Sequence, residues 1–168
     1  DALRFETMKE LEQRIAQENR METCMKPAML CVQPSYTQLG MAALLPHRVL
    51  SYEKESDEVF ADGVSTKGTA NRTKILQNTV PKSTAIKAEE FLTVCNKEWV
   101  KDYDLVYIYS DTIDKVGDVL ATETQVFKAT EDEMDKIVRI IKAIRDANGY
   151  NILITADHGY IYQNETLD

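Results

Sequence analysis

Cysteine is scarce in this chain. The three that are present, Cys24, Cys31 and Cys95, are odd in number and show no metal-ligand spacing. This usage fits a reducing cytoplasm, with each cysteine acting as a small apolar residue. Long apolar runs are also missing, because none approaches the ~20 residues of a membrane span, and no signal peptide is visible. We therefore expect a cytoplasmic protein that has no membrane partner.

Basic residues are outnumbered, with 20 Lys and Arg against 28 Asp and Glu, and the net charge is −8. This balance argues against non-specific electrostatic binding of nucleic acid, which needs clustered Lys and Arg. It leaves open the binding of a nucleotide at a metal ion, because the ion inverts the local charge. Part of the acidic excess could itself be metal ligands, although a solvated acidic surface explains most of it.

The 168 residues suffice for one domain with a core, and 43% hydrophobic and 29% charged residues are ordinary for a soluble globular protein. The chain opens directly on Asp1, and a helical pattern follows at once through Ile15. It ends ten residues after His158. An α/β domain would have a strand before this start and more chain after this end. We therefore expect a piece of a longer protein, truncated at one or both ends.

Apolar periodicity and turn residues predict alternating helices and strands, and hence a mostly parallel α/β sheet. A short antiparallel pair within residues 48–62, with Asp62-Gly63 at its turn, is predicted as an insertion or cap around residues 47–80. A loop is expected at 110–118. The helices expected elsewhere are 2–20, 37–45, one from 67 onward, 84–94 and 131–147, and the strands are 28–32, 104–109 and 151–155.

The most informative feature is Asp157-His158-Gly159, which follows the apolar run 151–155. Open α/β sheets place their ligands at the carboxyl ends of the strands, where these residues are expected. An Asp and a His supply one hard oxygen and one imidazole nitrogen, which suit Zn²⁺ or Mn²⁺. Gly159 allows the backbone to turn away sharply. Alone, the motif fits a structural turn at least as well as a metal site.

Ligand-type or nucleophilic residues also follow other apolar segments: Asp1, Thr37 and the loop 111–118 with its Asp114 and Asp118. In a parallel sheet all of them, with Asp157 and His158, would come to one edge. Each has a simpler interpretation, because Asp1 and Thr37 are acceptable helix N-caps and Asp118 could close a loop. Those interpretations do not explain why so many segment ends carry such residues.

This arrangement resembles the alkaline phosphatase superfamily. In that family a first strand ends in a metal-binding Asp, a Ser or Thr nucleophile starts a helix, a loop carries Asp-x-x-Gly-His or a relative of it, and a last strand ends in Asp-His-Gly. The chain is more closely similar to the PglZ domain, which is associated with BREX bacteriophage-resistance systems. The segments that carry this resemblance are 1–6, 34–46, 62–63 with 68–72, 109–118 and 155–160.

The resemblance implies a three-layer alkaline-phosphatase-like core, with a mostly parallel sheet flanked by helices, over residues 1–168. It also implies a two-metal site, in which Asp1, Asp157, His158 and the Thr37 oxygen hold one ion. Asp114 and Asp118 would hold the other. The ions are expected to be zinc, with manganese or magnesium as alternatives. Thr37 would be the nucleophile that attacks phosphorus.

The sequence departs from the superfamily at the second metal. Asp118 stands where the common pattern has His, a departure associated with PglZ. His47 is the only other histidine, and it lies on the wrong side of the chain to complete the site. The second metal site is therefore expected to be incomplete in these residues. Arg72 is a candidate for binding phosphate, although a structural surface role suits it equally.

The function implied is metal-dependent hydrolysis of phosphate esters, as a phosphatase or phosphodiesterase, in a bacterial phage-defence protein. The expected partners are a phosphate-ester or nucleotide substrate and other defence proteins. An alternative is a catalytically inactive module of the same fold that binds a partner or nucleotide in a defence complex. A mutase relative shares the metal motifs, but the stretches around Thr37 and Gly68 argue against it.

Overall fold

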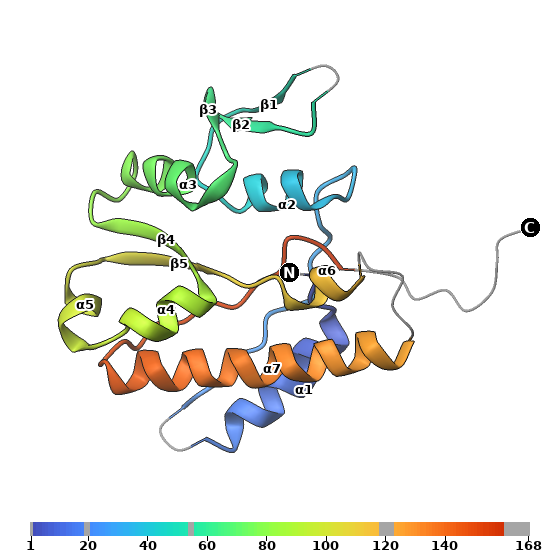
Figure 1. Cartoon of the computed structure of the whole chain (residues 1–168), viewed down its shortest axis with the longest axis vertical. Coiled ribbons are helices and arrows are strands. Elements are labelled where there is room, and N and C mark those ends of the chain that lie inside the picture. Colours follow the sequence, from blue (N-terminus) through green and yellow to red (C-terminus); the bar gives the residue numbers. More distant parts are fainter. Residues whose placement is uncertain (1, 19–20, 54–55, 118–122, 160–168) are drawn as a thin grey trace, which may run out of the picture.

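The computed structural model describes residues 2–18, 21–53, 56–117 and 123–159, and it is a mixed α/β structure (Figure 1). None of the described helices is long and apolar enough to cross a membrane. The elements in chain order are α1 (Phe5–Ala16), α2 (Thr37–Ala43), β1 (Leu50–Tyr52), β2 (Val59–Ala61), β3 (Val64–Ser65), α3 (Gly68–Gln77), β4 (Ser83–Lys87), α4 (Ala88–Val94), α5 (Lys97–Lys101), β5 (Leu105–Tyr109), α6 (Thr112–Gly117) and α7 (Glu123–Asp146).

The centre of the described structure is a parallel pair, β4 and β5, in register from Ser83 opposite Leu105 to Lys87 opposite Tyr109. Alternate side chains of the pair face opposite layers, as the period of a strand requires. Ala85, Leu105 and Tyr107 pack with α3, and Ile86, Val106 and Ile108 pack with α4 and α7. Figure 1 shows these helices above and below the strands. Parallel pairing in the described residues is limited to these two strands, so the α/β class stands but the three-layer, mostly parallel sheet is not confirmed.

The antiparallel pairing predicted within residues 48–62 is confirmed, in a sheet separate from β4 and β5. β1 pairs with β2, and β2 also pairs with a third strand, β3, that the sequence did not predict. The turn between β2 and β3 is Asp62-Gly63, with φ of 49° and 81°. The Asp62 carboxylate accepts the backbone N–H of Val49 at 2.9 Å, which ties the turn to the start of β1. The wider cap at 47–80 stays a prediction.

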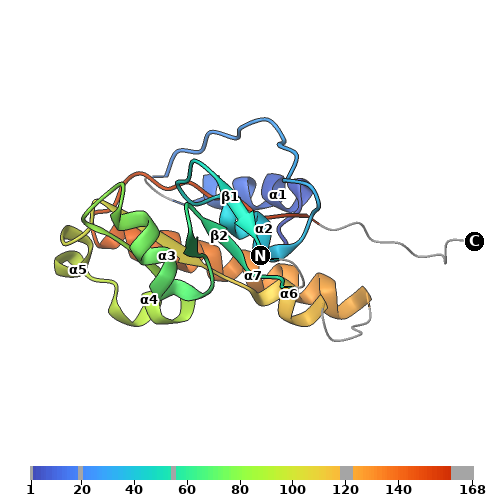
Figure 2. The same cartoon turned by 90° about the horizontal axis from the view of Figure 1, so that it is seen from above.

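Helix α7 is the longest of the described helices, and α1 lies alongside it (Figures 1 and 2). Leu11 and Ile15 of α1 pack against Met134 and Ile141 of α7 in one buried cluster. The helix predicted at 131–147 is therefore confirmed, with an earlier start at Glu123. The helix predicted at 2–20 is shorter, because Ala2 and Leu3 are buried before its first turn and Arg4 occupies the N-cap. Asp1, the residue expected to cap it, lies outside the described residues.

The strands predicted at 28–32 and 151–155 are not formed: both segments lack strand hydrogen bonding. They also leave apolar side chains exposed, with Leu30 fully exposed and Leu153 84% exposed. Ile154 alone of its run packs into the cluster between α1 and α7. An apolar run favours burial but does not specify the neighbouring strand that must supply its hydrogen bonds, and that partner decides whether a strand forms.

The prediction of one helix over 84–94 is wrong in its first part, because Ser83–Lys87 is the strand β4 and only Ala88–Val94 is helical. No glycine or proline separates the two elements in the sequence, so no breaking residue marks the point where the strand ends and the helix begins. The loop predicted at 110–118 is also partly wrong, since Thr112–Gly117 forms the helix α6. This helix places Asp114 in its first turn rather than in a loop.

A candidate metal-binding site beside Thr37

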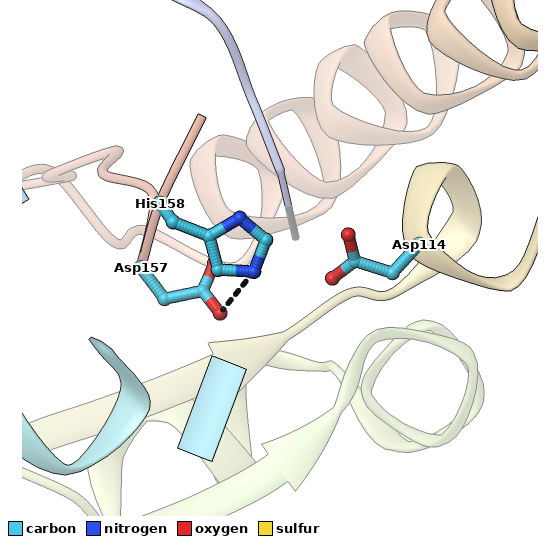
Figure 3. A group of neighbouring side chains, drawn as sticks. All are labelled: Asp114, Asp157 and His158. Carbon is cyan, nitrogen blue, oxygen red and sulfur yellow. Dashed lines mark ion pairs between the residues drawn. The ribbon is translucent and has the colours of Figure 1, made fainter. Parts of the chain in front are cut away.

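Asp114, Asp157 and His158 come together, each offering one ligand atom within 4.8 Å of the others. Asp114 reaches the cluster from α6, which follows directly after β5. Asp157 and His158 reach it from the extended segment after α7. Figure 3 shows Asp114 on one side of the cluster and the two other residues facing it. Residues predicted from separate parts of the sequence thus meet at the edge of the sheet where β5 ends.

Thr37 is the first residue of α2, and its Oγ1 lies 3.0 Å from Nε2 of His158. The other ring nitrogen, Nδ1, lies 3.1 Å from the carbonyl oxygen of Gly159. A carbonyl can only accept, so Nδ1 donates to Gly159, and Nε2 is the ring nitrogen that faces the Thr37 hydroxyl. The alternative that Thr37 caps α2 is wrong, because the N-cap position is Tyr36 and no side chain caps the helix.

The site is half-buried and contains two carboxylates. The side chain of Asp157 is 1% exposed and that of His158 is 15% exposed, with Oδ2 and Nε2 3.6 Å apart. Burial raises the pKa of Asp114, and the charge of Asp157 raises it further. His158 and the backbone N–H of Ala2 oppose that rise in the pKa. Two carboxylates and an imidazole are a donor set that suits Zn²⁺ or Mn²⁺, and a bound cation would offset the repulsion between the two carboxylates.

Helix α2 is held close to the Asp157 backbone by a glycine. A Cβ atom at Gly40 would lie 2.5 Å from the carbonyl oxygen of Asp157, which no real side chain tolerates. At the other end of α2, the Tyr107 hydroxyl of β5 donates to the Leu44 carbonyl at 3.1 Å. Sequence reasoning missed this role of Gly40. The available signal was a glycine inside a helical pattern, which often marks close backbone packing.

Gly40→Ala should therefore displace α2 and separate Thr37 from His158. We expect a loss of about 1–3 kcal/mol in the free energy of unfolding, typical of overpacking, together with weaker metal binding. Thermal unfolding of the full-length protein with and without Mn²⁺ measures both. Gly159→Ala is the matched control, because an added Cβ there meets nothing within 4 Å. Equal behaviour of the two variants would show that the close contact is not required.

The other residues that the sequence predicts for the site are Asp1, Asp118 and Arg72. Asp1 and Asp118 lie outside the described residues, although the neighbouring Ala2 contacts Asp114 through its backbone. Arg72, on α3, donates from Nε to the Thr66 carbonyl at 2.9 Å. Its guanidinium lies 4.4 Å from the centre of the Tyr109 ring. These contacts join α3 to β5, and Arg72 is not among the clustered residues.

His47, which the sequence set aside as a ligand, contacts the Leu45 carbonyl through Nδ1 at 2.7 Å. It is likewise not a member of the cluster. The structure thus brings together Thr37, Asp114, Asp157 and His158, while their roles as nucleophile and ligands stay predictions.

Comparison with known proteins gives a consistent result. The sequence model of the family described as "BREX system PglZ alkaline phosphatase-like domain" matches residues 1–168. The alkaline phosphatase-like protein BrxZ of Escherichia coli O9:H4 (strain HS) is 42% identical over 99% of this chain. The alkaline phosphatase-like protein PglZ of Bacillus cereus (strain H3081.97) is 39% identical over 99% of this chain. The chain spans 20% of the length of each of these relatives. No solved structure matches it.

Proposed function

This chain belongs to the BREX system PglZ alkaline phosphatase-like domain family, and on that premise we propose that it hydrolyses phosphate esters with the help of a divalent metal ion. The observation that carries the proposal is the meeting of a hydroxyl, Thr37, with the cluster of Asp114, Asp157 and His158, of which Asp157 is buried. A hydroxyl beside a cation site is the minimum that phosphoryl transfer to an enzyme side chain requires.

The metal ion is proposed to be held by Asp114, Asp157 and His158, with zinc favoured and manganese or magnesium as alternatives. Such an ion would supply Lewis acidity, lowering the pKa of a hydroxyl and stabilising charge on phosphate oxygens. Asp1 and Asp118 are proposed as further ligands by resemblance to the family, with the second metal site incomplete in these residues. Arg72 is retained as a weaker candidate for contacting phosphate.

Thr37 is proposed to attack phosphorus in line. A bond forms between Thr37 Oγ1 and phosphorus as the bond from phosphorus to the ester oxygen breaks. The proton lost by the Thr37 hydroxyl ends on the leaving oxygen, which departs as an alcohol. Water then cleaves the Thr37–phosphorus bond and returns the hydroxyl. Nε2 of His158 lies 3.0 Å from Oγ1, and it is also the nitrogen that would bind the ion, because Nδ1 contacts the Gly159 carbonyl oxygen. The proposed metal ligand therefore lies beside the proposed nucleophile.

The substrate is proposed to be a phosphodiester or phosphomonoester, including a nucleotide, handled in the cytoplasm beside other phage-defence proteins. The names of the relatives and the family description support a place in BREX defence. The net charge of −8 favours a small ester or a nucleic-acid end over binding along a duplex.

Removal of metal from the full-length protein tests this proposal. After treatment with a chelator, hydrolysis of bis(4-nitrophenyl) phosphate and of 4-nitrophenyl phosphate should stop. Addition of Zn²⁺, Mn²⁺ or Mg²⁺ in turn should restore the hydrolysis of at least one ester. Hydrolysis that persists unchanged in the chelated protein would rule out a required metal.

A second candidate is an inactive module of the same fold that binds a nucleotide or a protein partner. It is favoured by Asp118, which stands where the superfamily has a histidine ligand. The same experiment separates the two: tight metal binding without hydrolysis of either ester, in the presence of each ion, would support this second function.

A further inference from the structure

A half-buried lysine, Lys136 of α7, lies against the turn that leads from β5 into α6. Its side chain is 14% exposed. Nζ donates to Ser110 Oγ at 3.1 Å and to Thr112 Oγ1, and these residues lie on that turn and at the first position of α6. Asp114 follows Thr112 by two residues, so the lysine is hydrogen-bonded to the start of the helix that carries this candidate ligand.

The same amine is tied to two carboxylates. Nζ lies 3.0 Å from Glu89 Oε1 in the first turn of α4 and 3.4 Å from Oε2 of Glu133, whose side chain is 2% exposed. An ammonium group has three donors, and Ser110, Thr112 and Glu89 occupy them. Lys136 therefore links α4, α7 and the β5–α6 turn through one charged atom.

The charge of Lys136 is maintained despite its burial. Desolvation lowers its pKa, but the hydrogen bond to Glu89 and the charges of Glu133 and Glu89 outweigh that effect, and the net shift is upward. Lys136 is therefore charged at neutral pH, and its hydrogen bonds to Ser110, Thr112 and Glu89 tie the start of α6 to α4 and α7.

We propose that Lys136 is a positioning residue, which sets the place of the Asp114 carboxylate in the metal-binding cluster by holding Ser110 and Thr112. This proposal rests on the proposed function, in which Asp114 is a metal ligand. Residues that hold a metal ligand in place without touching the ion usually lower the metal affinity when they are replaced. A purely structural lysine would change thermal stability without changing the affinity of the folded protein.

The test is Lys136→Met in the full-length protein, with Co²⁺ as the probe. We expect Co²⁺ affinity, measured by titration at a temperature where the protein is folded, to fall about 10- to 100-fold. The visible spectrum of bound Co²⁺ should change as well, because the geometry of its ligands changes. Lys142→Met is the matched control. Lys142 lies on the same helix, is 41% exposed and forms an ion pair at 2.8 Å with Glu18, which follows α1. Its Co²⁺ affinity and spectrum should match those of the unaltered protein.

Thr112→Val supplies a second measurement that loses no charge and keeps the side-chain shape. It should lower Co²⁺ affinity in the same direction, and the double variant with Lys136→Met should bind no more weakly than Lys136→Met alone, because both act through one contact. If Lys136→Met does not fold, Thr112→Val decides the question by itself. Unchanged Co²⁺ affinity and spectrum in these variants would overturn the role of Lys136 while leaving the proposed function in place. Failure of the unaltered protein to bind Co²⁺ would overturn both.

Discussion

Thr37→Ala should abolish turnover while leaving metal binding in place. The substitution removes the hydroxyl 3.0 Å from His158 Nε2 but keeps every carboxylate and imidazole of the cluster. Loss of a catalytic nucleophile lowers kcat on the order of 10³- to 10⁶-fold. The lost hydrogen bond is worth about 1 kcal/mol, so the protein should remain folded. Steady-state hydrolysis of bis(4-nitrophenyl) phosphate and metal titration of the same sample measure the two quantities.

Thr37→Ser is the control for this prediction, because serine keeps a hydroxyl at the start of α2 and should retain much of the activity. Near-normal turnover by Thr37→Ala would remove Thr37 from the mechanism. A water molecule activated at the metal would then be the better candidate for the nucleophile. The distinction matters because attack by water passes through no covalent intermediate on the protein.

Asp157→Asn should abolish metal binding and hydrolysis together. The side chain is 1% exposed, so its negative charge is held at the cluster rather than screened by solvent. The amide keeps the size of the side chain but removes a charged ligand, and the metal affinity should fall by more than the roughly 10- to 100-fold expected for a supporting residue. Mn²⁺ should raise the melting temperature of the unaltered protein but not that of the variant, since only a bound ion stabilises the folded state.

Asp111→Asn is the matched control for that experiment. Asp111 also lies at the turn after β5, but it is 42% exposed and pairs with Lys115 at 2.7 Å. Its replacement should leave the Mn²⁺-dependent rise in melting temperature unchanged. Retention of the full rise by Asp157→Asn would mean that the ion binds without this carboxylate, and the cluster would need a different set of ligands.

The parts of the fold that sequence reasoning anticipated are those with local signals. The β-branched and aromatic run at 104–109, the strong apolar period at 131–147 and the turn Asp62-Gly63 each specify their element without outside help. The strand β4 escaped prediction because its alternation merges into the helix α4 with no breaking residue. The apolar runs at 28–32 and 151–155 predict strands, and the prediction is wrong because an apolar run does not indicate whether a partner strand is present.

At the site, sequence order and a family resemblance were enough to anticipate that Thr37, Asp114, Asp157 and His158 would meet. The supporting contacts were not anticipated. Gly40 and Lys136 act through neighbours that are distant in sequence, Asp157 and the Ser110–Thr112 turn, and no local pattern encodes such contacts. From sequence alone, a glycine in a helix and a lysine on a charged helical face are both expected to lie on the surface without a specific role. Only the folded structure shows which distant residues they contact.

The hydrogen bond between Thr37 and His158 joins residues 121 positions apart. Closing so long a loop carries an entropic cost that only a nearly complete fold repays, and non-local contacts of this kind form late. During synthesis α2 leaves the ribosome well before Asp157 and His158 are made, and domains acquire structure from the N-terminal side. A nascent or interrupted chain therefore carries Thr37 without Asp157 and His158. The order of synthesis itself keeps the candidate site unassembled until this part of the chain has been made.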